Sequence, residues 1–272
     1  MTPKVVLAGC GNMGGALLRG WIDRGLPSSE IVVVEPDAQR VVNAMQDVAI
    51  VASPDDVGGK PDVIVLAVKP QIIPLILSSY ARFAAEGTVI LSIAAGRTIE
   101  GLSFGLGDGR GASLAIVRAM PNTPAAIGRG ISVACASPGA DGRQRSLCAD
   151  LLAAVGSVLW VDDESMLDAV TAVSGSGPAY VFLLVECLMR AGIDVGLPAE
   201  FAERLARETV AGAGELLMRS QEGADRLRLS VTSPGGTTAA ALTVLMAETG
   251  GLQALMSKAV AAAARRSREL AS

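Results

Sequence analysis

Short apolar runs rich in β-branched residues alternate with segments of helical spacing over residues 1–161. The runs are continuously hydrophobic, as in the strands of a parallel sheet that helices cover on both faces. We expect strands at residues 5–8, 31–35, 63–67, 89–93, 116–120, 131–136 and 157–161, and helices at 14–24, 38–45, 72–81 and 143–154. The pattern predicts an α/β fold with a doubly wound, mostly parallel sheet.

The composition changes near residue 161. Strand-like runs stop there, and Ala, Leu, Met and charged residues recur at helical spacing to residue 270, with breaks at 192–198 and 230–236. A chain of 272 residues has room for two domains of ordinary size. We therefore expect a sheet domain over residues 1–161 and an all-helical domain over residues 162–272.

The expected helical domain is more apolar than helices that cover only their own core need to be. Residues 170–189 and 240–264 place Ala, Val, Leu and Met on more than one helix face. Burial against a second copy of the chain would cover this surface, so we expect a homodimer or a higher homo-oligomer. A larger contact with the sheet domain of the same chain is the alternative.

Composition excludes several classes of function. The chain has no histidine, which rules out imidazole bases, Ser-His-Asp triads and histidine metal ligands. Its four cysteines are far apart in the sequence, so we expect reduced thiols and no metal site. A net charge of −4 without a cluster of Lys or Arg argues against a nucleic-acid partner.

Neither the first residues of the chain nor its most apolar segment predicts a membrane protein. The first residues lack the pattern of an export signal. The uncharged residues 169–185 contain the stretch SGSGP, which fits a loop that enters a buried helix better than a membrane span. We expect a cytoplasmic protein.

A glycine-rich turn follows the first expected strand and opens the first helix. It reads Gly9-Cys10-Gly11-Asn12-Met13-Gly14. In this context the first glycine permits a tight turn, the second lets the backbone approach a pyrophosphate, and the third allows close helix–strand packing. The turn predicts a Rossmann-like dinucleotide site with the pyrophosphate at the helix N-terminus. A glycine turn without a ligand is the alternative.

Glu35 ends the second expected strand, where a carboxylate accepts hydrogen bonds from the ribose of an adenosine. Its charge would repel a 2′-phosphate and so favours NADH. Arg40, which follows shortly after, could instead pair with such a phosphate. The sequence therefore leaves both NADPH and NADH open as the cofactor.

The shortage of basic side chains also bears on the reaction. Dehydrogenases that act on alcohols need a base such as His, Lys or Tyr, and the lysines here are only Lys4, Lys60, Lys69 and Lys258. An imine needs less from the protein, because its C=N bond can be protonated in water and then accept a hydride. The composition is typical of a reductase that acts on imines.

Six motifs then occur in order over almost the whole chain. They are GCGNMG at residues 9–14, AVKP at 67–70, SIAAG at 92–96, RAMPNTP at 118–124, SGSGPAY at 174–180 and SPGGTT at 233–238. Together they closely resemble the motifs of pyrroline-5-carboxylate reductases, the last two most specifically. The resemblance implies NAD(P)H-dependent reduction of 1-pyrroline-5-carboxylate to L-proline, the final step of proline biosynthesis, by a homo-oligomer with interlocking helical domains.

The resemblance also implies which residues contact the cofactor. Besides the glycine-rich turn and Glu35, they follow or end three further expected strands, at the sheet edge where parallel sheets bind ligands. These residues are Ala67, Val68, Lys69, Pro70, Ala94, Ala95, Gly96, Met120 and Asn122. For Met120 alone, core packing is the alternative.

A substrate carboxylate would fit the turn at residues 233–238. Successive backbone N–H groups of Gly235, Gly236, Thr237 and Thr238 can face one anion where the next helix begins, and Ser233 opens the same expected site. In the family this last threonine contacts the substrate, so the resemblance implies that the Thr238 hydroxyl reaches the ring nitrogen. A helix cap without a ligand is the alternative.

Glu164 matches a family position at the substrate and is the second expected catalytic residue. Its carboxylate could stabilise positive charge on the iminium or hold a proton-donating water. A favourable interaction with a helix N-terminus is the alternative. Two departures from the family pattern, Arg228 and Ser230 where Lys and Asn are frequent, affect only fine contacts near the last motif.

Two other functions stay open at this point. One is a reductase of the same fold that acts on another cyclic imine. The other is a dinucleotide-binding regulatory protein that has lost turnover, against which the intact Thr238 and glycine turns argue.

Overall fold

The computed structural model describes residues 2–37, 47–85, 87–107 and 114–271. The expected helix at 38–45 and Arg40 lie outside the described residues. The chain divides into two compact units, Met1–Gly175 with Ala263–Ser272, and Ser176–Ala262. Each unit has its own architecture.

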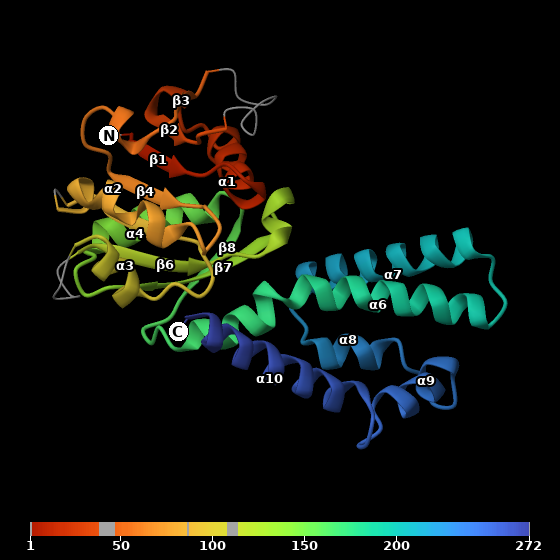
Figure 1. The fold of residues 1–272 in the computed structure, drawn as a ribbon. Helices are drawn as coiled ribbons and strands as arrows, with labels where there is room; N and C mark the ends of the chain where they lie inside the picture. Colours follow the sequence, from red (N-terminus) through yellow and green to blue (C-terminus); the bar gives the residue numbers. More distant parts are fainter. Residues whose placement is uncertain (1, 38–46, 86, 108–113, 272) are drawn as a thin grey trace. The chain divides into compact units, whose positions relative to one another are not determined.

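The first unit is built on one sheet (Figure 1), in which eight strands of the described chain run in the order β3-β2-β1-β4-β5-β6-β7-β8. The strands are β1 Val5–Ala8, β2 Ile31–Val34, β3 Ala49–Val51, β4 Val63–Leu66, β5 Val89–Ser92, β6 Ile116–Met120, β7 Gly130–Ala136 and β8 Gly156–Trp160. All neighbouring strands pair in parallel except β6 and β7, which are antiparallel. The prediction of a doubly wound, mostly parallel sheet is confirmed.

Helices cover both faces of this sheet. They are α1 Asn12–Asp23, α2 Ile73–Ala85, α3 Ile99–Gly105, α4 Gly142–Ala153 and α5 Met166–Val170, which runs into the π-helix η5 Thr171–Gly175. Short 3₁₀ turns lie at η1 Ser28–Glu30, η3 Pro54–Asp56 and η4 Thr123–Ile127. The expected helices at 14–24, 72–81 and 143–154 correspond to α1, α2 and α4, whereas β3 and α3 were not expected.

The core forms two clusters, one on each face of the sheet. Successive residues of a strand point to opposite faces, so Val5 and Leu7 pack with α1 and α4, while Val6 and Ala8 pack with α2 and α3. The indole Nε1 of the buried Trp21 donates to the Leu151 carbonyl oxygen at 2.9 Å. This bond joins α1 to α4 and satisfies the one polar atom of a large core side chain.

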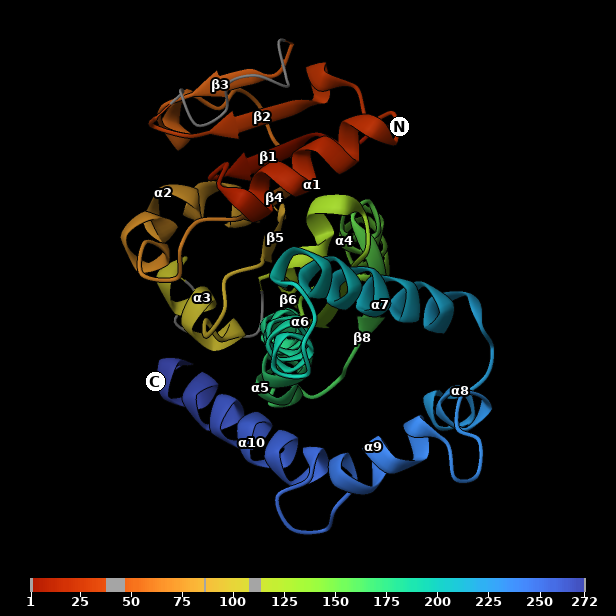
Figure 2. The same ribbon diagram turned by 90° about the vertical axis from the view of Figure 1, so that its right-hand side faces the viewer.

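The second unit is entirely helical in its described secondary structure. It contains α6 Gly177–Asp194, α7 Ala199–Arg219, α8 Ala224–Ser230, α9 Thr237–Leu245 and the first part of α10 Leu252–Ala271. Helices α6 and α7 lie side by side (Figure 2), joined through Gly196 at a φ of +101°. A Cβ atom on Gly192 would lie 3.3 Å from the Cβ of Ala202, so the glycine permits this close packing.

The last part of α10 belongs to the first unit. The Ser267 hydroxyl donates to Oδ1 of Asp168 at 2.6 Å, and the backbone of Leu270 lies beside Gly96. The expected domain boundary at 161/162 follows the end of β8, whereas the compact units divide at 175/176 and again before Ala263. The boundary at 161/162 stays a prediction.

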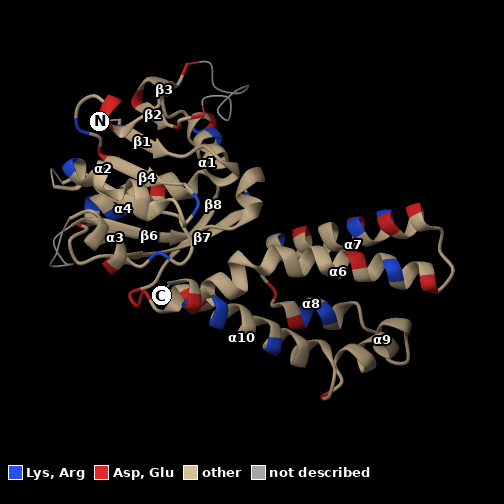
Figure 3. Ribbon diagram, viewed as in Figure 1, with Lys and Arg blue, Asp and Glu red and all other residues tan. Residues whose placement is uncertain are grey.

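Helix α6 exposes a stripe of apolar side chains. Val181, Leu184 and Leu188 lie three and four residues apart on one helix face, and 43–45% of each is exposed. By length and composition alone, the segment Met166–Asp194 would pass for a membrane span among the described residues. Helix α7 carries both glutamates and arginines (Figure 3), some of them in the i,i+4 pairs Glu203–Arg207 and Glu215–Arg219.

Candidate active site

The three glycines of the turn between β1 and α1 each meet a different steric demand. Gly9 has a φ of +89°, and a Cβ there would lie 2.6 Å from Cγ1 of Val68. A Cβ on Gly14 would lie 2.4 Å from the carbonyl oxygen of Gly9, so this glycine lets α1 approach β1. A Cβ on Gly11 would meet no atom within 4 Å. Gly11 therefore presents open backbone, as the approach of a pyrophosphate requires.

The N-terminus of α1 completes an anion site. Gly11 is its N-cap, no side chain caps the helix, and no acidic residue lies in the first turn. The first N–H groups of a helix have no partner within it and carry the positive end of the helix dipole. The residues present thus fit the diphosphate of a dinucleotide.

Glu35 lies directly after β2, beside the glycine-rich turn. Its Oε2 accepts from the Cys10 backbone N–H at 3.1 Å, and its Oε1 accepts from the Asp37 N–H at 3.3 Å. The residue is 8% exposed, so these bonds hold a buried carboxylate in one place. Each oxygen keeps a further lone pair for a ribose hydroxyl.

Cys10 is buried in the same turn. Burial first, and the charge of Glu35 second, raise the pKa of its thiol. The thiol therefore stays neutral near pH 7 and adds no negative charge next to the diphosphate site.

The loops after β4 and β5 lie along the same edge of the sheet. Ala67 and Val68 pack directly on Gly9 and Gly14, while Lys69 is exposed and Pro70 half-buried. Ala94 and Gly96 are buried and Ala95 is half-buried. The Arg97 side chain donates through Nε to the Pro70 carbonyl oxygen at 2.9 Å, which ties the two loops together. The structure brings the expected cofactor residues of β1, β4 and β5 to one place.

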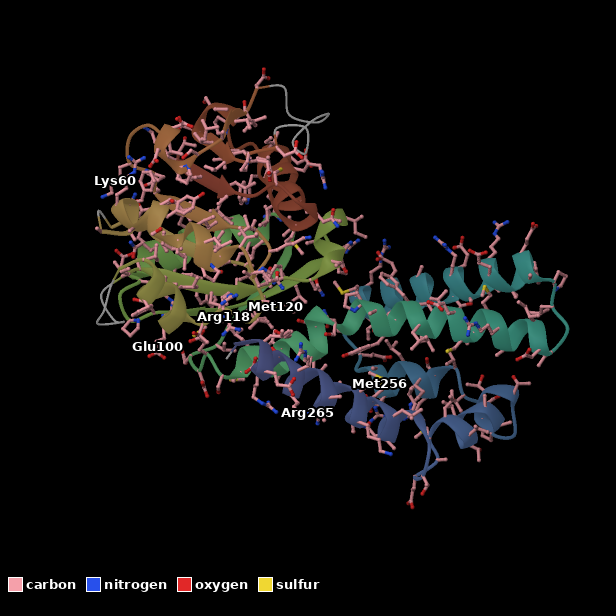
Figure 4. The ribbon with its side chains drawn as sticks, in the orientation of Figure 1. Lys60, Glu100, Arg118, Met120, Met256 and Arg265 are labelled. Atoms are coloured by element: carbon pink, nitrogen blue, oxygen red, sulfur yellow. The ribbon has the colours of Figure 1, made fainter. Side chains whose placement is uncertain are left out.

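Met120 is the last residue of β6 (Figure 4), and Asn122 lies two residues beyond it. The Met120 methyl fills the space where a Cβ of Gly175 would lie, at 2.6 Å. The Asn122 side chain accepts from the Ile131 N–H at 2.9 Å and donates to the Ser174 carbonyl oxygen at 3.2 Å. Both expected cofactor residues therefore also contact the π-helix η5 or the strand beside it.

Glu164 follows β8 and is paired inside the first unit. Its Oε1 accepts from Nη1 of Arg118 at 2.8 Å and from the Ile99 N–H at 2.8 Å. Arg118 is 5% exposed, so Glu164 neutralises a buried cation and caps the first turn of α3. Oε2 accepts no hydrogen bond from the described residues. A catalytic role for Glu164 stays a prediction.

The SPGGTT turn lies in the second unit and begins α9. Gly235 has a φ of +70°, which favours glycine, and a Cβ on Gly236 would lie 2.5 Å from the hydroxyl oxygen of Ser233, which would have to move. Gly236 is the N-cap, and no side chain caps the helix. The half-buried Thr238 makes no side-chain hydrogen bond within the described residues. The turn offers backbone N–H groups and a hydroxyl to a ligand.

Two residues beside the candidate site, Arg118 and Arg97, were not expected from the sequence. Arg118 stands in the quoted RAMPNTP motif, and a charge inside a buried strand demands a partner, which was the available signal. Arg97 gave no such signal, because its bond to Pro70 depends on how two loops meet. Among the described residues, no group of three Cys, Asp or Glu side chains could hold a metal ion.

A surface cavity away from these residues has a volume of about 680 Å³ and is lined by residues such as Trp21, Asp62 and Arg143. Asp62 precedes β4, so the cavity opens at the amino-terminal edge of the sheet. None of the expected site residues lines it.

Comparisons with known proteins match both units. A family model described as pyrroline-5-carboxylate reductase dimerisation matches residues 164–270. A second model, described as NADP oxidoreductase coenzyme F420-dependent, matches residues 4–96. The chain thus combines a nucleotide-binding oxidoreductase region with a dimerisation region.

Relatives match over the full length. A pyrroline-5-carboxylate reductase from Pseudomonas aeruginosa is 40% identical over 99% of this chain and 97% of its own, and one from Synechocystis is 38% identical over 99% of each. The solved structure of such a reductase from Coxiella burnetii covers all of both chains with a TM-score of 0.92 and 34% identity.

A pyrroline carboxylate reductase from Plasmodium falciparum, solved with NADP bound, has a TM-score of 0.82 and 28% identity over 99% of this chain and 98% of its own. The agreement in sequence and fold extends from the glycine-rich turn to the end of α10. On this full-length agreement, the chain belongs to the pyrroline-5-carboxylate reductase family.

Proposed function

We propose that the chain reduces the C=N bond of 1-pyrroline-5-carboxylate with NADH or NADPH, which gives L-proline and completes proline biosynthesis. The observation that carries this proposal is the full-length match to reductases of that name, in a chain whose Gly9–Gly14 turn has the geometry of a dinucleotide site. The reaction needs no imidazole, in agreement with a sequence that has none.

The cofactor site extends along the carboxyl edge of the sheet. The residues that would hold the diphosphate at the N-terminus of α1 are Gly9, Cys10, Gly11, Asn12, Met13 and Gly14. Glu35 would accept from the adenosine ribose, and the ends of β4, β5 and β6 would hold the opposite end of the cofactor. Bound NADH or NADPH supplies the hydride that adds to C5 of the imine.

The substrate carboxylate is held by the turn at residues 233–238. The N–H groups of Gly235, Gly236, Thr237 and Thr238 face the anion at the start of α9, and the Thr238 hydroxyl contacts the ring nitrogen. That nitrogen carries the proton that balances the added hydride, and water supplies it. Catalysis is mainly positioning and electrostatic stabilisation.

Glu164 has only one carboxylate oxygen available for a role at the substrate. Its Oε1 already accepts from Arg118 and Ile99, so only Oε2 is available to hold a water or to stabilise positive charge on the substrate. The same carboxylate supports α3, whose preceding loop carries Ala94, Ala95 and Gly96.

We also propose that the chain is a cytoplasmic homodimer, or a higher homo-oligomer, formed through its C-terminal helices, with no membrane or nucleic-acid partner. The exposed stripe on α6 and the match to a dimerisation model over residues 164–270 support this assembly. A second subunit would cover the apolar face that leads Met166–Asp194 to pass for a membrane span.

Initial rates test the proposed function. Purified protein is mixed with racemic 1-pyrroline-5-carboxylate and either NADH or NADPH, and both dinucleotide oxidation and proline are measured. Imine-dependent oxidation with an equal yield of proline supports the proposal. Turnover only on a six-membered cyclic imine, or cofactor binding without turnover, contradicts it.

A further inference from the structure

We propose that Asn122 is a positioning residue for the reduction, because its side chain fixes the π-helix η5 to the sheet edge beside the nicotinamide end of the cofactor. The inference rests on the proposed function, from which it takes the position of the cofactor along the sheet edge. It assigns Asn122 a role other than the direct cofactor contact expected from the sequence.

Both the oxygen and the nitrogen of the Asn122 carboxamide form hydrogen bonds. Its Oδ1 accepts from the Ile131 N–H at 2.9 Å, and its Nδ2 donates to the Ser174 carbonyl oxygen at 3.2 Å, both within the range of ordinary hydrogen bonds. Asn122 is also the N-cap of η4, yet its side chain makes no capping bond. An asparagine at such a position usually caps its own helix. Here the side chain instead joins β6, β7 and η5.

The segment that Asn122 holds is a π-helix, Thr171–Gly175. Turns of this kind are rare and occur frequently at functional sites. A second contact holds the same segment, since the Met120 methyl occupies the space beside the Cα of Gly175. The π-helix is thus attached to the end of β6 by one polar and one apolar contact.

The strand order shows which part of the cofactor is nearby. Relative to β1, with its diphosphate turn, β2 and Glu35 lie on one side, and β4, β5 and β6 lie on the other. Glu35 marks the adenosine side, so the nicotinamide extends toward the ends of β4 to β6. Asn122, just beyond β6, therefore fixes η5 near the nicotinamide end of the cofactor. The adenosine end lies far from it along the same edge of the sheet.

Loss of the Asn122 hydrogen bonds should disturb the geometry of hydride transfer and leave adenosine binding intact. Asn122→Asp keeps an acceptor for Ile131 but cannot donate to Ser174 when ionised, and Asn122→Ala removes both bonds. We expect kcat to fall roughly 10- to 100-fold in both, while the Kd for ADP-ribose, which lacks the nicotinamide, stays within about twofold. Without any cofactor, amide hydrogen exchange in residues 171–175 should be faster than in the wild type.

Thr88→Val is the matched control. The Thr88 hydroxyl donates to the Pro61 carbonyl oxygen at 2.7 Å and also joins two segments, but it is buried just before β5, at the opposite edge of the sheet. Its loss should lower the melting temperature and leave kcat and exchange in residues 171–175 unchanged.

The outcomes separate the two proposals. An inactive wild type contradicts the proposed function, and the exchange data still test the attachment of η5. With an active wild type, the inference is overturned if kcat and exchange are unchanged. It is also overturned if ADP-ribose affinity falls in step with kcat, or if neither Asn122 variant folds under conditions in which Thr88→Val does.

Discussion

At the scale of single residues, we expect the buried carboxylate of Glu35 to set which cofactor the chain prefers. Two backbone N–H groups hold it beside the glycine-rich turn, so it cannot move away from a 2′-phosphate. We expect a preference for NADH, and Glu35→Ser should shift the ratio of kcat/KM toward NADPH by about tenfold or more, since like charges at such range repel strongly.

Glu30→Ser is the control for this prediction. It removes the same charge just before β2, at the opposite end of the strand from Glu35. An equal shift in both variants would assign the preference to net charge and would contradict a specific role for Glu35.

Thr238 offers a hydroxyl without a partner among the described residues, at the start of α9. Thr238→Ala should lower kcat/KM by roughly 10²- to 10³-fold, as loss of one preorganised donor does, and Thr238→Ser should restore most of the activity. Thr243→Ala removes a hydroxyl of the same helix that bonds only to Ala239, and should have no effect on rates. Unchanged steady-state constants in Thr238→Ala would remove this residue from the mechanism.

The thiol of Cys148 should make the free energy of unfolding depend on pH in the alkaline range. Burial in α4 raises the pKa of its thiol from 9.0 to about 12. Above pH 9 the unfolded thiol loses its proton while the folded one keeps it, so the free energy of unfolding falls as pH rises. The slope is about 1.4 kcal/mol per pH unit for one proton.

Urea unfolding at several pH values above 8 measures this effect. The wild type should lose stability with pH more steeply than Cys148→Ala. Cys187→Ala, which removes an exposed thiol, should retain the wild-type slope. Equal slopes in all three proteins would contradict the assignment.

Among the elements, those that carry the candidate cofactor site could be predicted well. Strands β1 and β6 have the expected bounds, because their buried runs are apolar throughout in β1 and apolar apart from Arg118 in β6. Strand β3 has three residues and is largely exposed at the sheet edge, and α3 has seven, too few for a periodic pattern. The pairings of Glu164 with Arg118 and of Asn122 with Ser174 join residues 46 and 52 positions apart, which no local pattern reveals.

The junction of β1 and α1 permits a test at this scale. A Cβ on Gly14 would meet the backbone of Gly9 at 2.4 Å, and backbone cannot yield as a side chain can. Gly14→Ala should therefore displace α1, weaken dinucleotide binding and lower the free energy of unfolding by about 1–3 kcal/mol. Gly142→Ala, in the first turn of α4 with open space around it, is the control. Normal cofactor affinity in Gly14→Ala would contradict the packing argument.

At the scale of the whole molecule, the diphosphate turn belongs to the first compact unit and Thr238 to the second. The second unit buries few of its own side chains, with only Ala202 and Ala206 below a tenth exposed on the described α6 to α9. Burial against a partner subunit would supply what such a unit lacks.

The double variant Leu184→Glu with Leu188→Glu tests this assembly. It places two charges on the apolar stripe of α6, so sedimentation should show a shift toward monomer. Leu75→Glu, at a position 74% exposed on α2, should leave the oligomer intact. Assembly that persists unchanged in the double variant would place the interface elsewhere.

Transfer of deuterium tests whether the chain passes a hydride from the dinucleotide to C5 of the imine. The wild type is given 1-pyrroline-5-carboxylate and NADH that carries deuterium at both C4 positions, and the product is analysed by mass spectrometry and NMR. We expect L-proline with one deuterium, at C5. Unlabelled proline, or oxidation of the dinucleotide without proline, would contradict this expectation.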